Sequence, residues 1–316
     1  MRAAFFPSLL GRRESITALF LLALTTAVAA AAPAFRSAHT LHDLLANAAP
    51  LAVAAAGMTL VIVAGGIDIS VGSMLAVCAV VAGKCANAGW PLPAVAAGAV
   101  LTGAALGSFN GLLVSRAGVP AIIATLGTMS ILRGLLVLAT RGAWIPLPET
   151  LRTFGTGRAL GVPLVALSAL PAVALAGWFL GRTVQGRAFY ATGSNPAAAR
   201  LAGIDVAGVT QRAFLLCGAM TGLAAFLYAA RFTTIQSNAG QGFELVVITA
   251  VVVGGTNIFG GSGSVLGSLL GVLLLGVVGS APTFVGLSEY WEQAVQGLLI
   301  LLAVVTDRVA ALRRAP

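Results

Sequence analysis

Long apolar runs separated by short polar breaks make up almost the whole chain. A helix needs about 20 apolar residues to cross a hydrocarbon layer of ~30 Å, and ten runs approach or exceed that length. The predicted spans are 16–34, 44–64, 71–89, 92–115, 119–140, 162–181, 213–230, 243–260, 263–281 and 291–306. This pattern predicts an all-α fold, a polytopic transmembrane helical bundle of about ten spans.

Composition supports a membrane protein and argues against a nucleic-acid partner. Hydrophobic residues make up 59% of the 316 residues and charged residues 9%, whereas a soluble domain has roughly 25% charged residues. The net charge of +9 is scattered between apolar runs and is not gathered on one face, as nucleic-acid binding would require. We therefore expect the lipid bilayer as a partner and no nucleic acid.

The distribution of arginine predicts the orientation of the bundle. Short cytoplasmic loops collect basic residues, and most arginines fall on the side of both termini and of the polar segment 181–212. These arginines are Arg2, Arg12, Arg13, Arg116, Arg182, Arg187, Arg200, Arg212, Arg308, Arg313 and Arg314. The bias predicts that both termini and the 181–212 loop are cytoplasmic, the N-in and C-in arrangement.

The first apolar run, 16–32, also resembles a secretory signal, because arginines precede it and small residues follow it. Its length is at the short end of the range for a spanning helix and above that of a usual signal core. We expect an uncleaved first helix.

Few residues in the chain could carry out chemistry on their own. The cysteines and histidines, which lack metal-ligand spacing, are Cys78, Cys85, Cys217, His39 and His42. The single lysine, Lys84, is followed by cysteine, so the phosphate-binding pattern GxxxxGK[ST] is absent. We expect no catalytic residue, no metal and no cofactor in this chain, and therefore no enzyme. A partner ATPase would have to use any ATP and Mg.

Two glycine-doublet turns interrupt apolar runs, one around Asp68 and one around Asn257. Irregular backbone at membrane depth is tolerated only where protein shields it or where it lines a water-filled cavity, so both turns are predicted in the bundle interior. Asp68 could cap the following helix or face a solute route. Glu244 could likewise complement a helix dipole or face such a route.

Other polar residues within the spans have two interpretations, interhelical hydrogen bonding and solute contact. Arg133 also needs a partner or water, unless it snorkels to the outer face. The candidates for a translocation path are Asp68, Asn47, Asn110, Thr125, Glu244 and Asn257.

Glycines spaced four apart favour close packing of helix backbones. The sets are Gly103, Gly107 and Gly111, then Gly218 and Gly222, then Gly263, Gly267 and Gly271.

Two polar stretches are predicted on the outer side. The segment 141–162 contains prolines and glycines that predict a loop without regular helix over the outer mouth, and 232–244 is a second polar stretch. Both could receive something that arrives from outside.

Four ordered motifs give the chain a resemblance to a known family. They are AGGIDISVGSMLA (64–76), FNGLLVSRAGVPAIIATLGTMSILRGL (109–135), GRAFYATGSNPAAARLAGI (186–204) and FELVVITAVVVGGTNIFGGSGSVLG (243–267). At these residues the chain resembles the permease subunit of a bacterial ABC sugar importer of the ribose/xylose class. Smaller details, such as 78–93 and 142–152, are similar to autoinducer-2 and rhamnose permeases.

The resemblance implies a single transmembrane permease domain over 1–316, in the bacterial inner membrane, that moves a monosaccharide or related polyol inward. It also implies two ABC ATPase subunits, a second permease subunit that is identical or paralogous, and a periplasmic or extracellular sugar-binding protein. The alternatives are an ABC permease for branched-chain amino acids or nucleosides and, in another class, an ion-coupled secondary transporter.

The resemblance further implies that 181–212 is an ATPase-docking loop. The family pattern for its coupling helix falls on Gly193, Asn195, Ala198, Ala199, Gly203 and Ile204. Local chemistry agrees, because Asn195 can cap a helix begun by Pro196, and Gly203 can end it. Ser194 departs from the second glycine of many relatives.

Overall fold

The computed structural model describes residues 12–284 together with 291, 294, 297, 298 and 301. The helices are α1 (Arg12–Ala31), α2 (Ala38–Val63), α3 (Val71–Asn87), α4 (Leu92–Ser115), α5 (Ala121–Thr140), α6 (Glu149–Thr156), α7 (Leu164–Arg182), α8 (Val184–Ser194), α9 (Pro196–Leu201), α10 (Val206–Ala229), α11 (Phe243–Val253) and α12 (Val265–Phe284), with a 3-10 turn η1 (Pro33–Arg36). Within this part of the chain α1, α2, α4, α5, α7 and α10 are long and apolar enough to cross a membrane. The all-α polytopic bundle is confirmed.

Helices occupy every predicted window that the structure describes, but several boundaries differ from the prediction; α2, for example, begins at Ala38 and not at 44. The window 243–260 is not one spanning helix, because α11 ends at Val253 and its 11 residues rise only about 16 Å. Conversely, α10 begins at Val206 and not at 213, because the Asp205 side chain accepts from the Gly208 N–H and caps it.

The tenth predicted span, 291–306, lies outside the described residues apart from isolated positions, as do Arg2 and the arginines after 301. The N-in and C-in orientation therefore stays a prediction.

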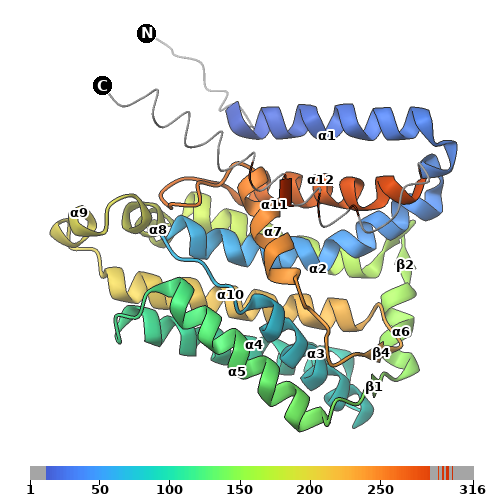
Figure 1. Ribbon diagram of the computed structural model, residues 1–316, viewed down its shortest axis with the longest axis horizontal. Helices are drawn as coiled ribbons and strands as arrows, with labels where there is room; N and C mark the ends of the chain where they lie inside the picture. The colour runs from blue at the N-terminus through green and yellow to red at the C-terminus, as the bar shows by residue number, and fades with distance from the viewer. Residues whose placement is uncertain (1–11, 285–290, 292–293, 295–296, 299–300, 302–316) are drawn as a thin grey trace.

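The helices are stacked in layers that run between two ends of the bundle (Figure 1). α1 covers α12, the next layer is α2 with α7, and α10, α4 and α5 follow. α8 and α9 lie at one end, here called the α9 end; α6 and the short strands lie at the other, the strand end. α2 is enclosed by these layers, and its residues from Val53 to Val63 are all buried.

Small residues allow α4 and α10 to pack backbone against backbone. A Cβ added to Gly103 would clash with the carbonyl oxygen of Gly218, and one added to Gly107 with that of Phe214. Gly267 and Gly271 on α12 approach α11 and the turn after it in the same way. The packing prediction is confirmed for these sets except at Gly263, which precedes α12 and has φ +149.

The two polar stretches at the strand end meet each other. β1 (Ile145–Pro146) pairs antiparallel with β4 (Thr234–Ile235), and β2 (Arg158–Ala159) pairs with β3 (Val162–Pro163). The prediction that 141–162 contains no regular helix was wrong, because α6 forms there. Its amphipathic face buries Leu151, and its Gly155 packs on the carbonyl of Ala230.

Candidate functional site

A capped helix projects from the α9 end. The Asn195 side chain accepts hydrogen bonds from the N–H groups of Ala197 at 3.1 Å and Ala198 at 3.0 Å, Pro196 begins α9, and Gly203 follows with φ +80. The helix predicted from local sequence is therefore confirmed.

One face of α9 packs on the bundle, and the opposite face contacts no other part of the chain that the structure describes. Ala199 is buried and Ile204 half-buried, whereas Pro196, Ala198 and Leu201 are exposed, Leu201 at 91%. Exposed apolar residues at the tip of a bundle are typical of an interaction surface.

The predicted glycine turns meet at the α9 end, where they join α8 to the core. The Gly261 N–H donates to the Val63 carbonyl at 3.0 Å, and the Cα atoms of Gly65 and Gly193 lie against Gly260. Gly260 and Gly261 have φ of +92 and +73, which favours glycine.

Gly193 therefore contributes close packing and does not lie on the exposed face of α9. Tyr190 on α8 adds a hydrogen bond from its hydroxyl to the Gly263 carbonyl at 2.7 Å. Its pKa is raised, mainly because burial disfavours the phenolate and also because of the charge of Glu14.

Asn257, a predicted path residue, is half-buried in the glycine-doublet turn after α11. Its side chain accepts a hydrogen bond from the Phe259 N–H at 3.1 Å.

Asp68 lies in a buried polar cluster before α3. Its Oδ1 accepts from the Ser70 N–H at 3.0 Å and the Ser70 hydroxyl at 2.6 Å. Asn110 donates to the Ser70 hydroxyl at 2.8 Å, and the Thr125 hydroxyl is 3.4 Å from the Ile67 carbonyl. The N-cap position of α3 is Ser70, so Asp68 shapes the turn and is not the cap.

The structure thus brings together three of the six predicted path residues, while Asn47, Glu244 and Asn257 lie outside this cluster. Asp68, Asn110 and Thr125 are all buried, whereas Asn47 is exposed on α2. The glycine-doublet motif around Asp68 and the position of Asn110 within an apolar span indicated polar sites, but neither could indicate that Asp68 and Asn110 share one cluster.

We expect Asp68→Ala to destabilise the protein by about 3 kcal/mol or more, because each buried donor without an acceptor costs ~1–3 kcal/mol. Asp68→Asn keeps an acceptor for Ser70 and should cost less. Thermal unfolding of the purified variants in detergent measures both. Equal stability of Asp68→Ala and the wild type would contradict the structural role of this cluster.

A second polar site surrounds the segment between β4 and α11. Glu244 lies in the first turn of α11 as predicted, with its carboxylate against Gly72 of α3. Arg133 on α5 donates to the carbonyl oxygens of Ala239 at 2.8 Å and Ser237 at 3.2 Å. Arg133 therefore has partners and does not depend on snorkelling.

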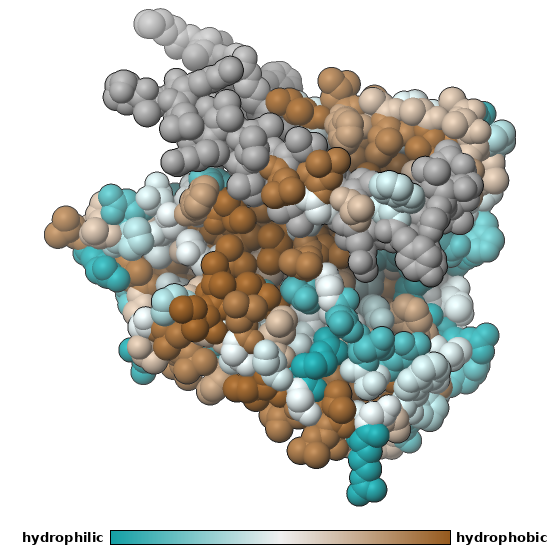
Figure 2. Space-filling model, viewed as in Figure 1, coloured by the Kyte–Doolittle hydropathy of each residue, from teal (hydrophilic) through white to brown (hydrophobic). Residues whose placement is uncertain are grey.

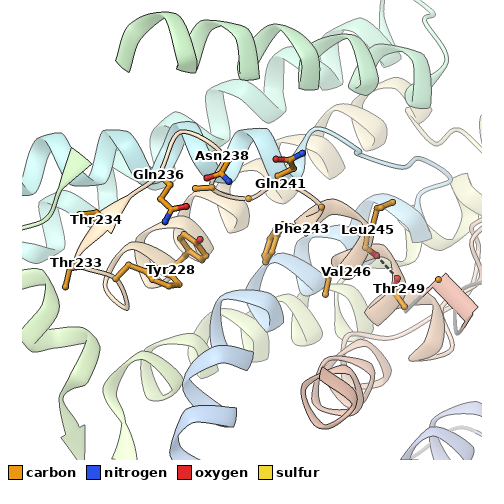
Figure 3. A pocket seen from close by; sticks show the side chains of 15 residues that line it. Tyr228, Thr233, Thr234, Gln236, Asn238, Gln241, Phe243, Leu245, Val246 and Thr249 are labelled. Carbon is orange, nitrogen blue, oxygen red and sulfur yellow. Dashed lines mark hydrogen bonds between the residues drawn. The ribbon is translucent and has the colours of Figure 1, made fainter. Parts of the chain in front are cut away.

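Two cavities flank this segment. One, of about 550 Å³, lies between α3, α5 and α11; the other, of about 1160 Å³, lies on the side of α10 and α11. Figure 3 shows the amides of Gln236, Asn238 and Gln241 above Phe243 and Tyr228 in the larger cavity. Asn238 and Gln241 line both cavities. Sequence reasoning identified the polar stretch but missed these individual side chains.

The comparisons with known proteins agree with this architecture. The sequence model of the family described as "Branched-chain amino acid transport system / permease component" matches residues 40–304. No solved structure matches the chain.

Two curated relatives match over nearly the whole chain. The autoinducer 2 import system permease protein LsrC of Enterobacter sp. (strain 638) is 37% identical over 301 residues, which cover 95% of this chain and 88% of that protein. The ribose import permease protein RbsC of Escherichia coli (strain K12) is 38% identical over 312 residues, which cover 97% and 96%. This chain belongs to the family of branched-chain amino acid transport system permease components.

Proposed function

We propose that this chain is the permease subunit of an ATP-binding-cassette importer that moves a monosaccharide or related polyol inward across the bacterial inner membrane. The observation that carries the proposal is the similarity over 97% of the chain to a ribose import permease. The autoinducer 2 permease matches to a similar degree, and membrane-spanning helices form the bundle.

The proposed mechanism needs partner chains, because the sequence has no phosphate-binding loop. Two ATPase subunits grip the 181–212 loops of two permease subunits, identical or paralogous, and use ATP and Mg. An external binding protein delivers the solute at the strand end. Closure of the ATPases moves α9, with the proposed coupling residues Gly193, Asn195, Pro196, Ala198, Ala199, Gly203 and Ile204, and switches access.

The joint between α8 and the two glycine turns supports this route for the movement. α9 follows α8 directly, and α8 contacts Gly65 and Gly260 through Gly193. A displacement of α9 would therefore reach the segment that leads to Asp68 and the turn after α11.

Co-purification tests the proposal. The chain is tagged at its C-terminus, extracted gently from native membranes, and its partners are identified by mass spectrometry. We expect an ATPase with a phosphate loop, and ATP-dependent sugar uptake by the complex in proteoliposomes. Recovery of the chain alone, with transport that needs no ATP, would favour an ion-coupled secondary transporter instead.

A further inference from the structure

The smaller cavity, beside α5, holds two opposite charges that no direct ion pair joins. It is lined by Ser73 on α3, by Met129, Ser130, Arg133 and Val137 on α5, by Ser237, Asn238 and Gln241 on the segment before α11, and by Glu244. In Figure 2 hydrophilic residues gather over the segment between β4 and α11, beside the hydrophobic surface of α5. Such a polar recess in an apolar bundle is costly unless it binds water or a solute.

Arg133 forms hydrogen bonds through one of its guanidinium nitrogens, which leaves the guanidinium with further N–H donors. Its Nη1 donates to two backbone carbonyls of the segment before α11. A guanidinium has five N–H donors, and among the described residues the hydrogen bonds of Arg133 all come from Nη1. The remaining donors are therefore available to a molecule in the cavity.

Glu244 offers acceptors that complement these donors. Glu244 lines the same cavity as Arg133, yet the ion pairs of the described residues, defined by a distance of 4.0 Å or less, do not join the two. Its carboxylate packs against Gly72, where any larger residue would collide with it. Arg133 is thus bound to backbone carbonyls before α11, and the Glu244 carboxylate packs against Gly72. The two charged groups do not form a direct ion pair.

We infer that this cavity is a contact site for a neutral, polyhydroxylated solute on its way through the protein. This inference rests on the proposed function and names the residues that would contact its solute. Arg133 donates to solute oxygens, Glu244 accepts from solute hydroxyls, and the three serines and two amides can do either.

The lining also argues for the chemical class of the solute. One arginine and one glutamate cancel in charge, so the site does not favour a net anion or cation. A branched-chain amino acid zwitterion could also use both charges and contact Met129 and Val137, so leucine is included among the test solutes. A sugar needs polar partners around its ring, which this cavity supplies.

Uptake by the assembled importer tests the inference. The complex with its ATPase and binding protein is reconstituted in proteoliposomes and supplied with ATP and radiolabelled ribose, xylose, rhamnose or leucine. We expect Arg133→Gln and Glu244→Gln each to lower sugar uptake by about tenfold or more, since a hydrogen bond to a charged group is lost. ATP hydrolysis by the complex should stay near the wild-type rate, which a merely misfolded variant would not maintain.

The control is Arg116→Gln, which removes an exposed arginine at the C-terminal end of α4, outside the cavity and outside the segments proposed to contact partner chains. Its sugar uptake should stay within about twofold of the wild type. Equal losses in Arg116→Gln and in the cavity variants would overturn the inference.

A second pair of variants tests the cavity without changing Arg133 or Glu244. Ser130 is exposed and lines the cavity, so Ser130→Trp should block uptake while leaving complex assembly intact. Leu138→Trp, at an exposed position of the same helix outside the cavity, is the control and should transport normally. Normal uptake by Ser130→Trp would overturn the inference.

The outcomes separate this inference from the proposed function. A wild-type complex that imports leucine and none of the three sugars would overturn the proposed function. Wild-type sugar uptake that Arg133→Gln and Glu244→Gln retain in full would overturn only the assignment of the cavity. Import of leucine that depends on both charges would overturn the solute class.

Discussion

Gly218→Ala is expected to destabilise the folded bundle by about 2 kcal/mol or more. The added methyl group would overlap the carbonyl oxygen of Gly103 and approach the Cα of Gly107 at 2.8 Å. Both obstacles are backbone atoms, so a change of rotamer cannot relieve them, and α4 must move away from α10. Overpacking of this kind costs about 1–3 kcal/mol and sometimes more.

Thermal unfolding in detergent and the yield of monodisperse protein measure this effect. Gly134→Ala is the matched control, because it also lies within a helix, α5, and a Cβ there meets nothing within 4 Å. Alanine in an unobstructed helix position should stabilise by about 0.5–1 kcal/mol. A Gly218→Ala variant as stable as Gly134→Ala would refute the close approach of α4 and α10.

Ala198→Arg is expected to abolish most ATP-driven uptake, with a loss of tenfold or more, by weakening the proposed contact with the ATPase. Ala198 is exposed on α9, and arginine is a good helix former, so the fold should tolerate the change. A long charged side chain on a small docking face instead introduces a clash and an unpaired charge, which cost several kcal/mol in a packed interface.

Co-purification of the ATPase and uptake in proteoliposomes measure this loss. Ala198→Ser keeps the side chain small and should retain both activities. Thr153→Arg adds the same charge at an exposed position of α6 and should retain the ATPase. If Ala198→Arg retains the ATPase and full uptake, α9 is not the coupling helix.

Local sequence patterns were sufficient where the determinants lie close together in the chain. Asn195, Pro196 and Gly203 predict the beginning and end of α9, because capping, N1 proline and left-handed glycine act within one or two turns. The window 92–115 coincides with α4, since a proline begins it and polar residues follow it. The length of the apolar runs predicts the remaining long helices.

Local patterns misled where a neighbouring element or an unrecognised cap sets the structure. The run 243–260 was assigned to one span although the predicted glycine-doublet turn around Asn257 lies within it; the helix ends at Val253, directly before this doublet, and the turn fits against Gly193 and Val63. Residues 206–212 were assigned to the polar loop 181–212, yet Asp205 caps a helix there and α10 packs on α4 and α2.

The sequence by itself determined the class of the protein, its helices and its family, because apolar length, glycine spacing and motif order are all properties of the chain. It also indicated candidate polar residues within the apolar runs. Only the tertiary structure decided how those residues are grouped. Asp68 joins Asn110 in one cluster, and Arg133 and Glu244 line the same cavity, whereas Asn47 lies apart from both. These groupings depend on contacts between helices distant in the chain, which no local pattern specifies.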